Sequence, residues 1–122
     1  MKSPHTGIKR IFNAFIYSYD GFKSAFQSEA AFRQDLILFG IGTVLAVCLP
    51  VELLSKSLLI SSLFLILLME LVNTAIETVV DRISPDYHNL SKKAKDIGSL
   101  LVLMAFINMI LIWTSIIIQY LK

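Results

Sequence analysis

Residues 58–80, LLISSLFLILLMELVNTAIETVV, decide the fold of this chain. The stretch is long enough to cross a membrane, because a transmembrane helix needs roughly 20 mostly apolar residues. It nevertheless carries two acids, Glu70 and Glu77, in its second half. A carboxylate inside a membrane costs about 3 kcal/mol, and acids that persist there usually serve a function. We therefore expect a membrane protein with chemistry built into its central span.

The composition of the whole chain also indicates a membrane protein. Of the 122 residues, 56% are hydrophobic and 16% are charged, whereas soluble domains carry about 25% charged residues. The length allows one domain at most. The net charge of +2 is too small to predict a nucleic-acid partner. Cys48 lies in an apolar run, where we expect it to be buried. The polar start is not followed by a signal-peptide core, so we expect the first residues to be kept.

Two more apolar stretches, one before and one after residues 58–80, complete the pattern of an all-α membrane protein with three transmembrane helices. We expect the spans at about residues 30–49, 54–82 and 92–120, in a single domain that covers residues 1–122. A break is predicted at Ser84–Pro85, because proline disfavours helix in the residue before it. Ser91 is the candidate cap of the helix that leads into the last span.

The segment before the first span predicts an amphipathic surface helix at about residues 7–27. Its apolar residues recur at steps of three and four, at Ile8, Ile11, Phe12, Phe15, Tyr19, Phe22 and Phe26. A helix with such a stripe lies in the membrane interface, with its apolar side in the acyl boundary. The alternative is a helix of the soluble type that packs on the membrane bundle.

The lysines and arginines predict the orientation of the spans. Five precede the first span, namely Lys2, Lys9, Arg10, Lys23 and Arg33, and the loop at 81–96 carries Arg82, Lys92, Lys93 and Lys95. The loop at about 50–56 has only Lys56. Positively charged loops stay in the cytoplasm. The N-terminus and the loop at 81–96 are therefore expected to be cytoplasmic and the C-terminus periplasmic.

The polar residues of the central span share one helical face. At 100° per residue, Glu70, Asn73, Thr74, Glu77 and Asp81 fall within about 100° of one another. Glu70 and Glu77 are about 10 Å apart along the axis, which suits two roles at two depths rather than one shared ion. Glu70, the deeper acid, has no cation within helical reach and is a candidate general base.

Two further expectations follow from this stripe of acids. Three helices cannot shield a polar stripe from lipid on all sides, so we expect it to face another subunit of a homo-oligomer. The alternative is that the acids are structural and pair with Arg82 or Lys95.

A second acidic segment, residues 28–35, lies at the start of the first span, where Glu29 and Arg33 are spaced for an ion pair.

The residue types favour magnesium and phosphate chemistry over other reactions. The chain has no phosphate-binding glycine loop, its histidines are too isolated for a zinc site, and no serine has a histidine partner. Carboxylates suit Mg²⁺, and lysine or arginine suits phosphates. The basic candidates are Arg10, Lys92, Lys93 and Lys95.

Three motifs resemble the bacterial integral-membrane diacylglycerol kinase family, in particular its Gram-negative branch. They are the run from Glu70 to Arg82, the pair Tyr87–His88 with residues 94–99, and the segment 29–34. The likeness covers Gly7 to about Trp113. It implies a homotrimeric helical bundle in the inner membrane, which uses ATP and Mg²⁺ to phosphorylate the hydroxyl of 1,2-diacylglycerol and give phosphatidic acid.

The resemblance also implies roles for individual residues. The acid that matches Glu70 is regarded as the catalytic base, and those that match Glu29 and Glu77 as the magnesium ligands. The residues expected to bind ATP are Arg10, Tyr17, Glu29, Glu77, Asp86, His88, Lys95 and Asp96. Those expected to bind the lipid are Arg10, Ala31, Phe32, Arg33, Gln34, Asp35, Glu70, Asn73 and Ser99.

Some assignments stay open within this resemblance. Asn73 is expected to orient either Glu70 or the lipid hydroxyl, and Asp96 is the alternative base. Asp35 replaces a more usual glutamate and Lys92 a small residue, while Tyr19 and Phe26 stand where enteric members carry tryptophan. These departures bear on the fit of the lipid and on depth in the interface rather than on the chemistry.

Two other functions also stay open. Undecaprenol kinases of Gram-positive relatives share the catalytic motif, although the segment Ala30–Gln34 argues against this function. A non-enzymatic channel or proton-conducting oligomer could use the stripe of acids, but it would not need Lys95, Asp96 or the segment around Glu29.

Overall fold

A computed structural model describes residues 6–122, which form four α-helices and no strand. The helices are α1 (Ile8–Ser28), α2 (Ala30–Cys48), α3 (Leu53–Ile83) and α4 (Asn89–Leu121). α2, α3 and α4 are each long and apolar enough to cross a membrane. The predicted all-α class with three candidate spans is therefore confirmed. Lys2, one of the charges used above to orient the chain, lies outside the described residues.

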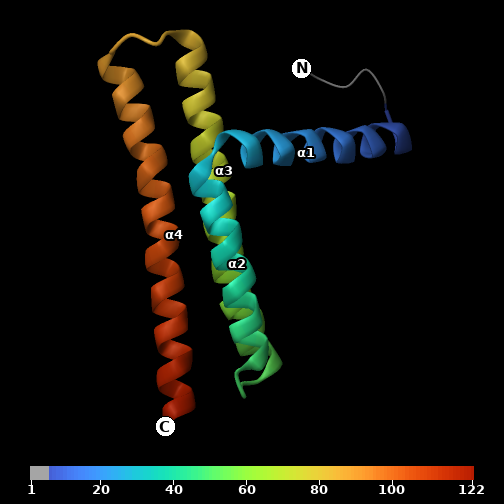
Figure 1. The fold of residues 1–122 in the computed structure, drawn as a ribbon, viewed down its shortest axis with the longest axis vertical. Helices are drawn as coiled ribbons and strands as arrows, with labels where there is room; N and C mark the ends of the chain where they lie inside the picture. Colours follow the sequence, from blue (N-terminus) through green and yellow to red (C-terminus); the bar gives the residue numbers. More distant parts are fainter. Residues whose placement is uncertain (1–5) are drawn as a thin grey trace.

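The three long helices lie side by side, and α1 projects from them at a steep angle (Figure 1). α3 is the central helix, because it packs against both α2 and α4. The turn between α3 and α4 lies at the same end as α1 and extends past it, whereas the C-terminus and the α2–α3 connection lie at the opposite end (Figure 1). This arrangement brings the predicted surface helix and the basic loop to one end of the molecule.

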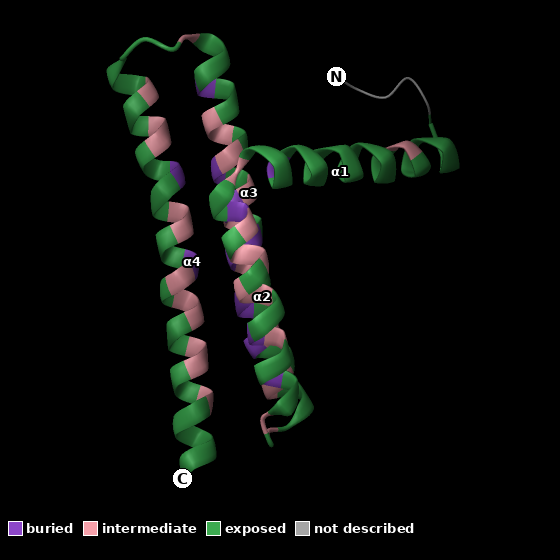
Figure 2. Cartoon of the chain, viewed as in Figure 1, coloured by how far each residue is buried: buried purple, intermediate pink, exposed green. Residues whose placement is uncertain are grey.

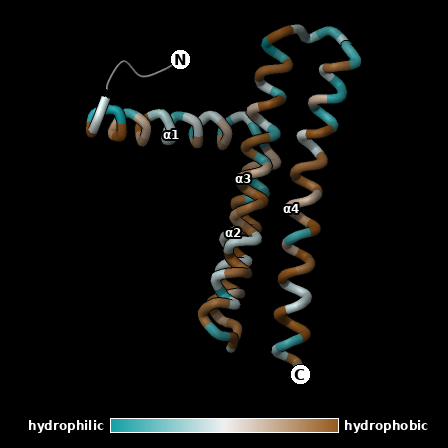
Figure 3. Tube along the Cα trace, turned by 180° about the vertical axis from the view of Figure 1, so that it is seen from behind, coloured by the Kyte–Doolittle hydropathy of each residue, from teal (hydrophilic) through white to brown (hydrophobic). Residues whose placement is uncertain are grey.

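Burial is concentrated on α3, as Figure 2 shows. Its buried residues are Leu59, Ser62, Leu63, Ile66, Leu67, Glu70, Asn73 and Val80. Many large apolar residues of α2 and α4 are exposed, and Figure 3 shows that the residues along the middle of α4 are mostly hydrophobic. Cys48 is exposed too, so its predicted burial was wrong, because it points about 200° away from the buried Ala46. In a membrane these exposed apolar residues contact lipid or another protein chain.

α1 touches the rest of the chain only near its last turns. Ala25 is its one buried residue and joins Phe32 and Leu67 in a small core, with Leu71 packed beside them. The residues of the predicted apolar stripe are all exposed: Ile8, Ile11, Phe12, Phe15, Tyr19, Phe22 and Phe26. Phe22 meets the ring of Phe32 of α2 edge-on, with the ring centroids 5.6 Å apart. The part of the stripe from Ile8 to Tyr19 lies away from the bundle, which favours the interfacial helix over the helix packed on the bundle.

The corner between α1 and α2 is closed by Arg33. Glu29 is a single extended residue between the two helices, with φ −115° and ψ 107°. Arg33 Nη1 donates to the carbonyls of Phe26 (2.6 Å) and Gln27 (3.2 Å), which lack partners at the end of α1. The predicted ion pair between Glu29 and Arg33 was wrong for the described residues, because Glu29 lies outside the helix.

The turn between α3 and α4 confirms the break at Ser84–Pro85 but corrects the helix cap. Ser84 is extended and ends α3. α4 begins at Asn89, where the backbone N–H of Leu90 donates to Nδ1 of His88 at 3.0 Å. The prediction that Ser91 caps this helix was wrong, because the imidazole supplies an acceptor three residues earlier.

Trp113 links the halves of α3 and α4 that lie away from this turn. Its Nε1 donates to Ser62 Oγ (3.1 Å) and to the carbonyl of Leu59 (3.3 Å). Trp113→Phe keeps an aromatic ring and removes the donor, so we expect the free energy of unfolding to fall by about 1 kcal/mol. Reversible unfolding in mixed detergent micelles measures the change. Ser115→Ala is the control, because that hydroxyl is exposed and bonds only to Leu111 of its own helix; equal stability of the two variants would contradict the prediction.

Candidate functional site

The predicted acids gather where α3 passes the corner between α1 and α2. Glu70 is only 8% exposed. The carboxyl groups of Asp35, Glu77 and Glu29 all act electrostatically on it, with Asp35 the strongest of the three. Neither ion pair found among residues 6–122 involves Glu70. Glu70 therefore lies among other carboxyl groups without an ion-pair partner of its own, while Lys95 acts electrostatically on Glu77 at the end nearer the α3–α4 turn. Such a concentration of carboxylates is an environment that attracts a divalent ion.

The contacts of α1 show where these acids lie along α3 relative to the surface helix. Ala25, near the end of α1, packs against Leu67 and Leu71 of α3. Glu70 lies between these two residues in the sequence and hence at the level of the surface helix. Glu77 lies about 10 Å further along α3, toward the α3–α4 turn. If α1 lies in the membrane interface, Glu70 is at the depth of lipid headgroups and Glu77 is nearer the water.

The amide of Asn73 joins this cluster from the same face of α3. Its Nδ2 donates to Glu77 Oε1 at 3.1 Å. The side chain is 9% exposed, and its Oδ1 has no N–H or O–H donor within the described part of the chain. From the sequence we expected Asn73 to orient Glu70 or a hydroxyl, whereas its amide donates to Glu77.

A second part of the site is a groove of ≈ 430 Å³ at the α3–α4 turn. Its lining residues come from the two helix ends and the loop: Val80, Asp81, Ser84, Pro85, Asp86, Tyr87, His88, Ser91, Lys92, Lys95 and Asp96. It therefore unites four of the residues expected to bind ATP, namely Asp86, His88, Lys95 and Asp96. Ser84 and Ser91 also line the groove, although the sequence suggested for them only a helix break and a helix cap.

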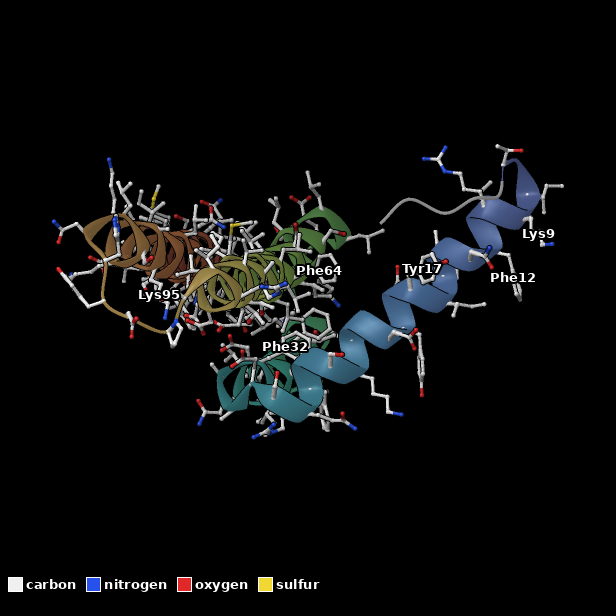
Figure 4. The ribbon with its side chains drawn as sticks, turned by 90° about the horizontal axis from the view of Figure 1, so that it is seen from above. Lys9, Phe12, Tyr17, Phe32, Phe64 and Lys95 are labelled. Atoms are coloured by element: carbon white, nitrogen blue, oxygen red, sulfur yellow. The ribbon has the colours of Figure 1, made fainter. Side chains whose placement is uncertain are left out.

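Two ion pairs hold the lysines of this groove. Lys95 Nζ is 2.8 Å from Asp81 Oδ1, and Lys92 Nζ is 2.6 Å from Asp96 Oδ2. Figure 4 shows Lys95 on the side of α4 that faces α3. Both pairs are largely exposed, and exposed pairs stabilise a fold very little. The lysines can therefore exchange their carboxylate partners for the phosphates of a ligand at small cost.

Two residues expected to bind ATP lie far from this groove in the single chain. Arg10 and Tyr17 are exposed on α1, which runs away from the spans (Figure 1). Measured along α1 from its end at the corner, Tyr17 is about 17 Å away and Arg10 about 27 Å. One chain therefore does not bring Arg10 and Tyr17 together with Lys95.

Most residues expected to bind lipid surround the corner, at the level of Glu70. Phe32, 2% exposed, lies where α1, α2 and α3 meet (Figure 4). Ala31 and Gln34 are exposed beside it. Asp35 faces Glu70, and Arg33 is engaged with the end of α1. Only Ser99, exposed on α4, and Arg10 come from elsewhere.

Two features near the acids escaped the sequence prediction. A groove of ≈ 560 Å³ separates α1 from α3 and is lined largely by small residues, among them Ser18, Gly21, Ser24, Thr74 and Thr78. Gly98 of α4 is buried directly against the side chain of Asn73. A glycine inside an apolar span is a known sign of close helix packing, which could have drawn attention to it.

Comparisons with known proteins show the family of this chain. Residues 16–117 match the family described as prokaryotic diacylglycerol kinase. The diacylglycerol kinase of Escherichia coli (strain K12) is 44% identical over 113 residues, which cover 93% of each chain. The diacylglycerol kinase of Pseudomonas aeruginosa is 44% identical over 91% of this chain and 90% of its own, and that of Helicobacter pylori (strain 26695) is 45% identical over 88% and 84%. With likeness that extends from α1 through α4, the chain belongs to the prokaryotic diacylglycerol kinase family.

Proposed function

We propose that this protein transfers the γ-phosphoryl group of ATP to the hydroxyl of 1,2-diacylglycerol and so makes phosphatidic acid in the bacterial inner membrane. The relatives named diacylglycerol kinase support the proposal. The observation that carries it is the position of Glu70: a buried acid without an ion-pair partner, level with the surface helix and below a lysine-containing groove. A lipid alcohol and a water-soluble phosphate donor can meet only at such a boundary.

Glu70 acts as the general base of a direct in-line transfer. It accepts the proton of the lipid hydroxyl while the hydroxyl oxygen bonds to the γ-phosphorus. The bond from the γ-phosphorus to the β–γ bridging oxygen breaks, and ADP leaves with the electron pair. Phosphoryl transfer depends mostly on positioning and electrostatic stabilisation, so a chain without a phosphate-binding loop is sufficient.

The acids on either side of Glu70 fit a magnesium ion. Within residues 6–122 no three potential ligands converge as a ready-made metal site. Mg²⁺, however, commonly takes only one or two carboxylates, together with phosphate oxygens and water. Glu29 and Glu77 would hold it, and the oxygen of Glu77 is already oriented by Asn73. When bound, the ion supplies charge neutralisation for the phosphates.

The groove at the α3–α4 turn receives the phosphates and the polar part of the nucleotide. Lys95 leaves Asp81 and neutralises phosphate charge, while Asp86, His88 and Asp96 line the same space. Because the turn extends beyond α1 (Figure 1), the groove lies on the water side of the surface helix. The N-terminus and this turn are accordingly cytoplasmic, and the C-terminus is periplasmic.

The active unit is a homotrimer with sites between subunits. Two observations support it: the exposed apolar faces of α2 and α4, and the distance of Arg10 and Tyr17 from the lysine groove of their own chain. In the trimer, the α1 helix of a neighbour supplies Arg10 and Tyr17. The groove between α1 and α3 gives room beside Thr74 and Thr78 for the substrate or for the adjoining chain.

A competition assay tests the substrate. Purified protein receives labelled ATP and equal amounts of diacylglycerol and undecaprenol, and the two lipid products are separated. We expect phosphatidic acid to exceed undecaprenyl phosphate roughly tenfold or more, as a site shaped for one alcohol would give. A preference for undecaprenol would assign the polyprenol kinase activity instead. Ion flux in liposomes without turnover of either alcohol would favour the channel.

A further inference from the structure

The side chain of Asn73 lies between one residue of its own helix and one of α4. Its Nδ2 donates to Glu77 Oε1 at 3.1 Å. At the other end of the amide, Oδ1 points at the place that a Cβ atom would occupy on Gly98. Such a Cβ would overlap Oδ1, so any larger residue at position 98 would force the amide of Asn73 to move. The amide therefore spans the gap from the acid on α3 to the backbone of α4.

Gly98 gives the buried Oδ1 of Asn73 the partner that it otherwise lacks. Oδ1 has no N–H or O–H donor among residues 6–122. The Gly98 hydrogen that replaces Cβ points toward this oxygen, as in the Cα–H···O contacts that recur between helices. An amide is planar, so holding Oδ1 against Gly98 aims Nδ2 toward Glu77. The chemistry fixes the assignment of the two ends, because only the NH₂ group can donate to a carboxylate.

We propose that Asn73, seated on Gly98, is a positioning residue that holds the Glu77 carboxylate ready for a divalent cation. The inference rests on the proposed metal role of Glu77. A neutral amide suits this task better than a lysine or arginine, which would cancel the negative charge that the cation needs. One donor also occupies only part of the carboxylate and leaves Oε2 free for the ion. The packing of α4 on α3 thereby sets the orientation of the Glu77 carboxylate, although Glu77 belongs to α3.

Cation binding by the full-length protein tests this role without relying on turnover. The probe is Mn²⁺, followed by electron paramagnetic resonance in the presence of a non-hydrolysable ATP analogue. We expect Asn73→Ala and Gly98→Ala each to weaken Mn²⁺ binding by about tenfold, the size of effect typical for residues that orient a metal ligand. Asn73→Leu fills a similar volume without a donor and should weaken binding equally, which separates positioning from packing.

The double variant gives the sharper result. Once Asn73 is alanine, the methyl group of Gly98→Ala enters space that the amide has left, so the second substitution should weaken Mn²⁺ binding no further. Two independent sites would instead give additive losses. Gly42→Ala is the matched control: Gly42 is also a buried glycine, but it packs against the side chain of Leu63, away from the acids. We expect it to leave Mn²⁺ binding unchanged.

The outcomes separate this inference from the proposed function beneath it. If Glu77→Gln weakens Mn²⁺ binding while Asn73→Ala and Asn73→Leu do not, the positioning role is overturned and the metal role of Glu77 stands. If Glu77→Gln itself has no effect, the metal role is wrong and the inference falls with it. Additive losses in the double variant would remove Gly98 from the mechanism, and if Gly98→Ala does not fold, the two Asn73 variants still decide.

Discussion

Glu70→Gln is expected to lower kcat for lipid phosphorylation by roughly 10²–10⁴-fold, the usual contribution of a general base. Glutamine has almost the same shape but cannot accept the proton of the hydroxyl. Glu70 is buried and has no ion-pair partner. Its one polar neighbour on another helix is Asp35 of α2, and the glutamine amide can donate to that carboxyl group, so the substitution should not break an interaction that holds the helices together. The loss should therefore appear in kcat and not in the folding or assembly of the protein.

The measurement is the initial rate of purified protein at saturating ATP, diacylglycerol and Mg²⁺, after its oligomeric state has been checked. Glu52→Gln is the control, because Glu52 is an exposed acid at the opposite end of α3 whose side chain makes no capping bond. A Glu70→Gln rate within a few-fold of the parent would reject the base assignment. Asp96→Asn then becomes the decisive variant, since Asp96 is the alternative base and lines the groove at the α3–α4 turn.

Glu77→Gln should abolish the dependence of nucleotide binding on Mg²⁺. In the parent protein, we expect Mg²⁺ to strengthen the binding of a non-hydrolysable ATP analogue, because an ion held by Glu29 and Glu77 would neutralise the charge of the phosphates. Without the Glu77 carboxylate, one of the two proposed ligands is missing, and the analogue should bind about equally with and without Mg²⁺. The bond from Asn73 remains possible in this variant, because the glutamine side chain still offers a carbonyl oxygen.

Titration calorimetry at several Mg²⁺ concentrations follows this change directly. Asp20→Asn, at an exposed acid on α1, removes the same charge from a residue that is not a proposed ligand and should keep the Mg²⁺ dependence of the parent. If Glu77→Gln binds the analogue with unaltered Mg²⁺ dependence, Glu77 is not a metal ligand. Glu29→Gln would then show whether Glu29, at the corner between α1 and α2, is a metal ligand on its own.

Much of the fold could be predicted because it depends on local properties of the chain. Apolar length marks the spans, Ser84–Pro85 marks the break after α3, and the helical period places Glu70, Asn73 and Glu77 on one face. Each of these needs only neighbouring residues. The exposed apolar stripe of α1 follows from the same periodicity.

The features that sequence could not predict depend on contacts between helices or on the exact end of a helix. The contact between Asn73 and Gly98 depends on how α4 packs on α3, and the proximity of Asp35 to Glu70 depends on how α2 is placed along α3. Arg33 is four residues from Glu29, which suits an ion pair within one helix, but the helix starts after Glu29 and the guanidinium of Arg33 reaches the carbonyls of α1 instead. Residue spacing gives directions within one helix and does not give distances between two.

The corner at Glu29 fixes how the surface helix and the first membrane span are joined. One extended residue joins a helix with an apolar stripe to a helix long enough to cross the bilayer, and Arg33 braces the angle between them. If the first of these helices lies at the lipid–water boundary, then Glu29, the proposed magnesium ligand at its end, is held at that boundary as well. The bilayer surface would then set the depth at which the reacting groups meet.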